Sequence, residues 1–95
     1  MRTVLLNGKR MNTKKSTHLY LKRKLSFPAY YGKNLDALWD VLSTMSDETD
    51  IVLYNKENLD ENLGIYGNTL LSVFNEAAES NKRIKFRVVD IKVRN

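Results

Sequence analysis

The sequence predicts an α/β fold in which about four helices pack on a three-stranded parallel sheet. Three short apolar runs have the length of strands, and the segments between them are long and mostly helical in the spacing of their apolar residues. Strands joined by such crossovers pair in parallel rather than as hairpins. Residues 1–95 are expected to form a single domain with one core of modest depth.

The chain is expected to begin with a strand and a helix. The apolar run Thr3 to Leu6 predicts the first buried strand, which the turn-forming pair Asn7-Gly8 ends. From Thr13 to about Leu25 the apolar residues keep helical spacing, with basic residues around them. This helix ends at Ser26-Phe27-Pro28, because the residue before a proline resists helical geometry.

The second predicted helix carries a feature that folding does not require. Asn34, a preferred N-cap residue, begins this helix, which extends to about residue 44. Asp36 and Asp40 lie four residues apart on one flank, next to Trp39 at the edge of the apolar face. Two like charges at this spacing cost roughly 0.2–0.5 kcal/mol, and no Lys or Arg follows within one turn. The pair therefore indicates a function beyond folding.

The second half of the chain is expected to alternate strand and helix. The apolar run Ile51 to Tyr54 predicts a second strand, and residues 56 to about 63 a short helix that Gly64 stops. Apolar residues keep helical spacing from Asn68 to Ser80, which gives the clearest helix of the chain. Ile84 to Val88 then alternates in the manner of a third strand.

Charge is segregated along the chain. Residues 1–33 carry a net charge of +9, residues 34–81 carry −9, and residues 82–95 carry +5, so the overall +5 hides an acidic middle. The basic ends leave open an alternative function, a small RNA- or DNA-binding module. That alternative predicts aromatic residues interleaved with the basic ones. Four aromatic residues lie instead within or beside the acidic middle, namely Tyr30, Tyr31, Trp39 and Tyr54, although Tyr20 and Phe86 do lie among basic residues.

Several classes of function are disfavoured. The absence of cysteine excludes disulfides and thiolate chemistry, and the single histidine, His18, nearly excludes common zinc sites and catalytic triads. Gly64 to Gly67 lacks the spacing and the lysine of a phosphate-binding loop. Asp36 and Asp40 would be similarly solvated, whereas a catalytic acid and base need different environments. We therefore expect no enzymatic activity, no cofactor and no metal site.

The sequence also gives expectations about location and individual side chains. The apolar run at the N-terminus is too short for a signal peptide, and no segment approaches membrane-spanning length, so we expect a cytoplasmic protein without membrane association. His18 is expected to be a half-buried packing residue with one hydrogen bond. One of Tyr30 and Tyr31 is expected to pack the loop against the core. Glu76, taken alone, is expected to be a solvated residue on the polar side of its helix.

Residues 28–40, with the sequence PAYYGKNLDALWD, resemble the signature of the barstar family, the intracellular inhibitors of barnase-type ribonucleases. The similarity extends to Val4–Gly8, Thr17–Leu19, Ser72–Ala77 and Ile84–Val88, and so covers nearly the whole chain. The resemblance implies an inhibitor, with an antitoxin or immunity role, whose partner is a barnase-like ribonuclease of secreted or toxin type. It further implies a monomer when free and no nucleic-acid partner.

The resemblance also implies which residues contact the enzyme. Helix carboxylates would replace the RNA phosphate among the cationic side chains of the ribonuclease active site. Lys33 stands where a family member has an acid and Met45 where that member has a tryptophan. The basic ends also make this chain cationic where that member is acidic, so the resemblance does not identify the ribonuclease. The implied partner-binding residues are Tyr30, Tyr31, Gly32, Asn34, Asp36, Trp39, Asp40, Met45 and Glu76.

Overall fold

The computed structural model describes residues 1–91, and in this range three strands form one parallel sheet. The strands are β1 (Arg2–Asn7), β2 (Thr49–Tyr54) and β3 (Ile84–Val88), in the spatial order β1-β2-β3. Ile51 in the central strand lies opposite Val4 on one side and Phe86 on the other. The predicted α/β class and the parallel pairing are confirmed.

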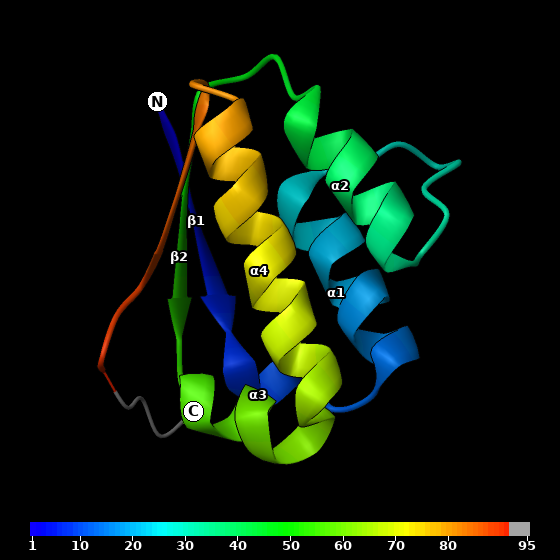
Figure 1. The fold of residues 1–95 in the computed structure, drawn as a ribbon, viewed down its shortest axis with the longest axis vertical. Helices are drawn as coiled ribbons and strands as arrows, with labels where there is room; N and C mark the ends of the chain where they lie inside the picture. Colours follow the sequence, from blue (N-terminus) through cyan, green and yellow to red (C-terminus); the bar gives the residue numbers. More distant parts are fainter. Residues whose placement is uncertain (92–95) are drawn as a thin grey trace.

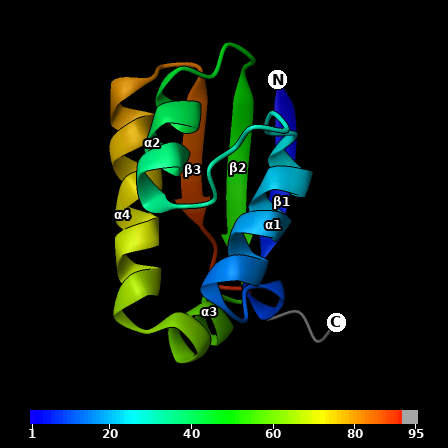
Figure 2. The same cartoon turned by 90° about the vertical axis from the view of Figure 1, so that its right-hand side faces the viewer.

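Three helices, α1 (Lys14–Leu25), α2 (Leu35–Ser43) and α4 (Ile65–Ser80), lie on one side of this sheet (Figures 1 and 2). The short helix α3 (Lys56–Leu63) lies at one end of the molecule. Capping residues at either end determine where these helices begin and end. Thr13 and Ser16 form a capping box that begins α1, and Ser26 ends it in a left-handed conformation at φ 56°. Gly64, at φ 54°, separates α3 from α4 as its position predicted. A 3-10 helix, η1 (Gly8–Arg10), directly follows β1.

Two predicted boundaries were wrong because polar or small residues interrupt the apolar pattern. Helix α4 begins at Ile65, not at Asn68. Its first turn contains Gly67, where an added Cβ would lie 2.7 Å from Leu59 Cδ2, so the missing side chain lets α3 and α4 pack closely. Strand β2 begins two residues earlier than the apolar run indicated, because Thr49 is fully buried although it is polar.

The core lies between the sheet and the helices. Phe74 of α4 stacks on Phe86 of β3 with ring centroids 4.7 Å apart, which joins the two layers. In the described residues, no helix combines the length and the hydrophobicity that a bilayer crossing needs. The fully buried large side chains of the core include Leu6, Leu21, Leu25, Leu38, Leu42, Ile51, Leu53, Leu59, Leu70 and Phe74.

Candidate functional site

The loop of residues 26–34, which we call the α1–α2 loop, is anchored by a buried aromatic pair. The ring of Tyr31 is 4% exposed and packs on Phe27, with ring centroids 4.8 Å apart. The backbone N–H of Tyr31 donates to the Pro28 carbonyl at 3.0 Å. Tyr30, by contrast, is 86% exposed. The expectation that one tyrosine packs on the core is confirmed, and the Tyr31 side chain supports the loop from beneath while Tyr30 faces solvent.

The end of the α1–α2 loop leads directly into α2. Asn34 caps the helix as predicted, with its Oδ1 accepting the N–H of Ala37 at 2.7 Å. Its Nδ2 also donates to the Gly32 carbonyl at 3.3 Å, so one side chain ties the loop to the first turn. A Cβ at Gly32 would lie only 3.2 Å from Ala37 Cβ, which leaves little room for a larger residue.

Helix α2 presents the two carboxylates to solvent. Leu38 and Leu42 are fully buried and therefore fix which face of the helix points inward. Asp36 and Asp40 are both exposed, and neither forms an ion pair with another side chain in residues 1–91. Trp39 is 36% exposed at the boundary of the buried face. The helix thus displays two negative charges that have no cationic side-chain partner in residues 1–91, beside an accessible indole ring.

Asn81, which follows α4, holds the other end of α2. Its Nδ2 donates to the carbonyls of Leu42 and Met45, at 2.9 and 3.0 Å, although these residues are far away in sequence. The C-terminal ends of α2 and α4 consequently lie side by side (Figures 1 and 2). Glu76 is exposed on α4, as predicted for a solvated residue. Sequence reasoning missed Asn81, because no local pattern marks its long-range hydrogen bonds.

A shallow hollow of about 280 Å³ separates Tyr30 from the C-terminal end of α2. Met45, half-buried, lines it together with Tyr30 and Val41. The hollow lies between two of the predicted partner-binding residues, one on the α1–α2 loop and one after α2. Its other lining residues are Arg2, Leu25, Ser26, Phe27, Pro28, Thr44, Ser46 and Asp47.

His18 differs from the expectation of a half-buried residue with one hydrogen bond. It is 1% exposed, and each ring nitrogen has a tyrosine hydroxyl as partner, Nδ1 at 2.7 Å from Tyr31 Oη and Nε2 at 2.6 Å from Tyr66 Oη. The sequence analysis did not predict that Tyr66 contacts His18, because Tyr66 lies in the first turn of α4, before the apolar pattern begins. Burial lowers the pKa of His18 and raises the pKa of both tyrosines.

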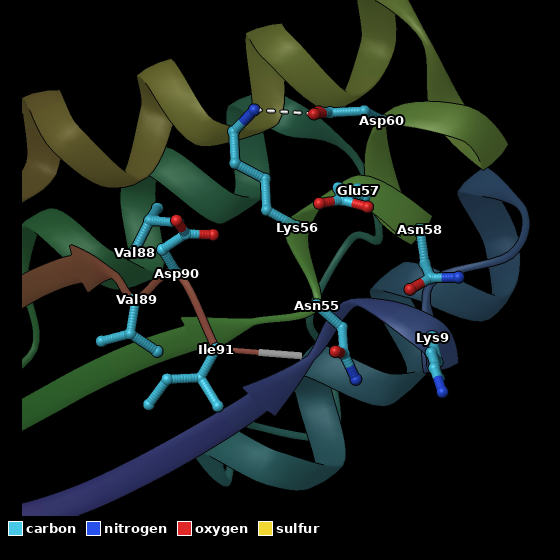
Figure 3. Close-up of a pocket in the computed structure, with 10 residues that line it drawn as sticks. All are labelled: Lys9, Asn55, Lys56, Glu57, Asn58, Asp60, Val88, Val89, Asp90 and Ile91. Carbon is cyan, nitrogen blue, oxygen red and sulfur yellow. Dashed lines mark hydrogen bonds and ion pairs between the residues drawn. The ribbon is translucent and has the colours of Figure 1, made fainter. Parts of the chain in front are cut away.

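A cavity of about 560 Å³ lies away from these residues, where β2 and β3 end (Figure 3). Charges of both signs line it, and Lys56 Nζ pairs with Asp60 at 2.7 Å. None of the predicted partner-binding residues lines this cavity. Over residues 1–91 no three His, Asp or Glu side chains gather closely enough to hold a metal ion. The lining residues are Lys9, Asn55, Lys56, Glu57, Asn58, Asp60, Val88, Val89, Asp90 and Ile91.

Comparison with known proteins finds similarity over nearly the whole length of this chain. The family model described as Barstar (barnase inhibitor) matches residues 1–91. A protein of Bacillus subtilis (strain 168), named "Putative ribonuclease inhibitor YrdF", is 40% identical over 90 residues, which cover 94% of this chain and 98% of that protein. The matched range of the family model includes the α1–α2 loop, α2 and α4.

Proposed function

Because the chain belongs to the barstar family, we propose that it is a ribonuclease inhibitor and not an enzyme. The observation that carries this proposal is the pair of exposed carboxylates on α2, Asp36 and Asp40, which have no cationic partner in residues 1–91. Their mutual repulsion opposes folding, so their presence is best explained by a partner that supplies positive charge. A ribonuclease active site, which must hold a phosphate, is such a partner.

Asp40 would enter the active site in place of the RNA phosphate. A carboxylate accepts two parallel N–H bonds from an arginine in the same geometry as a phosphate does. It offers no bond that the enzyme can cleave, so the active site stays occupied. Asn34 at one end of α2 and Asn81 at the other hold the helix in place, and this preorganisation reduces the entropy lost on binding.

The other residues of the proposed surface have distinct roles. The exposed Tyr30 would be an aromatic anchor on the α1–α2 loop, Glu76 would add a carboxylate from α4, and Trp39 would pack at the rim. Met45 would contact the enzyme through the hollow that it shares with Tyr30. Gly32 and Asn34 would contribute loop backbone and its rigidity, and Tyr31 would act through its backbone and its support of Tyr30.

The proposed partner is a barnase-like ribonuclease of secreted or toxin type, against which a monomeric, single-domain cytoplasmic inhibitor would protect its own cell. The charge segregation supports a cationic enzyme, because opposite potentials steer association. The basic residues of α1 would then lie outside the contact, since they would repel such an enzyme.

Stoichiometric titration tests the proposal. The purified chain is added to each member of a panel of barnase-like ribonucleases, and we expect the activity of at least one to fall linearly to zero near one equivalent. The double variant Asp36→Asn/Asp40→Asn serves as the inactive comparison, and a gel shift with RNA tests the nucleic-acid alternative in parallel. Full ribonuclease activity across the panel would remove the inhibitor assignment, and a salt-sensitive RNA shift would then favour the alternative.

A further inference from the structure

His18 connects three elements of the molecule, two of which carry residues of the proposed contact surface. The residue belongs to α1, one partner, Tyr31, belongs to the α1–α2 loop, and the other, Tyr66, belongs to α4. Both hydrogen bonds are short, and the His18 ring also packs against both tyrosine rings at centroid distances of 5.9 and 6.1 Å. Tyr31 is the immediate neighbour in sequence of the exposed Tyr30 and of Gly32, so this network holds a residue directly adjoining two residues of the proposed contact surface.

The exposure of the two tyrosines sets the direction of the hydrogen bonds. The Tyr31 hydroxyl is buried and has His18 as its hydrogen-bond partner within residues 1–91, so its O–H must donate to Nδ1 or remain unsatisfied. Nδ1 is then the unprotonated nitrogen, and the Nε2–H donates to Tyr66 Oη. Tyr66 is only partly buried, so its own O–H can donate to water.

We propose that His18 is a positioning residue for the α1–α2 loop, and that protonation at its Nδ1 releases Tyr31 and thereby weakens inhibition. The second half of this proposal rests on the proposed inhibitor function. In the protonation step a solvent proton binds the Nδ1 lone pair that now accepts the Tyr31 O–H. Nδ1 becomes a donor, Tyr31 can only accept from it, and the tyrosine proton loses its acceptor. A buried donor without a partner raises the free energy of the folded state. The Tyr31 hydroxyl can recover a hydrogen bond by moving toward water, and the loop then moves with it.

The surroundings of His18 favour the neutral ring at neutral pH. The groups that face it are Tyr31 from the loop and Tyr66 from α4, and on its own helix Lys14 lies one turn before it, with Nζ 4.8 Å from the centre of the Tyr66 ring. Lys22 follows one turn later on α1. Burial lowers the pKa of His18 below its ordinary value of 6.5, so the ring is neutral at neutral pH and takes up a proton only in acidic solution.

Amide hydrogen exchange in the free protein tests the positioning role without any ribonuclease. The probe is the Tyr31 amide, which donates to the Pro28 carbonyl within the loop. After correction for intrinsic exchange, we expect it to exchange about tenfold faster at about pH 5 than at about pH 7.5, equivalent to the loss of one hydrogen bond. His18→Gln keeps a donor and an acceptor but does not titrate, so its corrected rate should not change with pH.

Two tyrosine variants separate positioning from general stability. Tyr31→Phe removes the hydroxyl that bonds to His18. The backbone amide of residue 31 should then exchange quickly at every pH. Tyr66→Phe is the matched control, because it removes a hydroxyl from the same histidine on the side away from the loop. It should lower stability and yet keep the pH dependence of the Tyr31 amide. The proposal would be overturned if the corrected exchange rate of this amide depended equally on pH in the wild type and in His18→Gln. It would also be overturned if the amide of residue 31 exchanged slowly and with a pH dependence in Tyr31→Phe.

The link to inhibition is measured as a ratio. The enzyme's own groups titrate too, so the dissociation constant of the wild-type complex at each pH is divided by that of the His18→Gln complex. If about one molecule in ten keeps the α1–α2 loop in its binding conformation at about pH 5, this ratio rises about tenfold between about pH 7.5 and 5. A constant ratio would refute the effect on inhibition. If no ribonuclease is inhibited at any pH, the proposed function fails, and amide exchange alone decides the positioning role.

Discussion

Replacing Asp40 by asparagine should raise stability and abolish most of the binding. The Asp40 side chain makes no ion pair in residues 1–91, and the hydrogen bonds from Ser43 and Thr44 go to its backbone carbonyl, so the variant keeps them. Asn and Asp have similar helix propensities, so the main change is the lost repulsion from Asp36. The free energy of unfolding should therefore rise slightly, by roughly 0.2–0.5 kcal/mol.

The same substitution should weaken the ribonuclease complex strongly. Loss of one member of a buried charge pair leaves the enzyme's cations without a partner, which costs about 2–5 kcal/mol, a range that already includes measurements on the barnase–barstar complex. This corresponds to an increase in the dissociation constant of roughly 25- to 4,000-fold, mostly through faster dissociation.

The assay pairs denaturant unfolding with stopped-flow dissociation. Glu61→Gln is the matched control, since it makes the same change of charge at an exposed position on α3 and should alter dissociation less than about twofold. If Asp40→Asn dissociates no faster than Glu61→Gln, or if it is destabilised by several kcal/mol, then Asp40 is a structural residue and the phosphate-mimic reasoning is wrong.

Four further outcomes follow from the contacts described above. Asn81→Ala removes the bonds to the Leu42 and Met45 carbonyls and should lower the free energy of unfolding by about 1–3 kcal/mol in urea, and an unchanged midpoint would contradict this. Gly8→Ala would place a Cβ 2.0 Å from the Asn55 carbonyl oxygen and should destabilise by at least about 1–3 kcal/mol in the same assay. Neutralising Lys22, Arg23 and Lys24 together should leave inhibition within about twofold, and a large loss would mean that α1 forms the contact. Because the pKa of His18 is lowered on folding, the unfolded chain binds the proton more readily, so stability should fall as pH drops below 6.5, and this fall should be smaller in His18→Gln.

Local sequence signals determined most of the fold. The N-cap at Asn34, the stop at Gly64 and the apolar spacing of α2 depend on neighbours within one or two turns, and the structure has each of them where it was predicted. The errors occurred where a tertiary contact overrides local pattern, as at Gly67 against Leu59. Thr49 is the same kind of case, because burial in the sheet outweighs its polar character.

The candidate site was less predictable from the residues alone. The repulsive pair Asp36 and Asp40 is visible in the sequence, because its spacing is local. The proposal that Glu76 belongs to the same site came from the family resemblance, since helix spacing alone made it an ordinary solvated residue. The bonds of His18 to Tyr66 and of Asn81 to Leu42 join residues 48 and 39 positions apart, and no periodicity encodes such distances.

The central claim, that the chain fills the active site of a ribonuclease as a phosphate mimic, is tested most directly by competition. A nucleoside monophosphate that binds the enzyme's active site is added at increasing concentration, and the apparent dissociation constant of the inhibitor complex is measured. We expect a linear increase without a plateau, because the phosphate and the Asp40 carboxylate cannot occupy one position together. A dissociation constant that stays unchanged while the nucleotide saturates the enzyme would show that the inhibitor does not occupy the phosphate position.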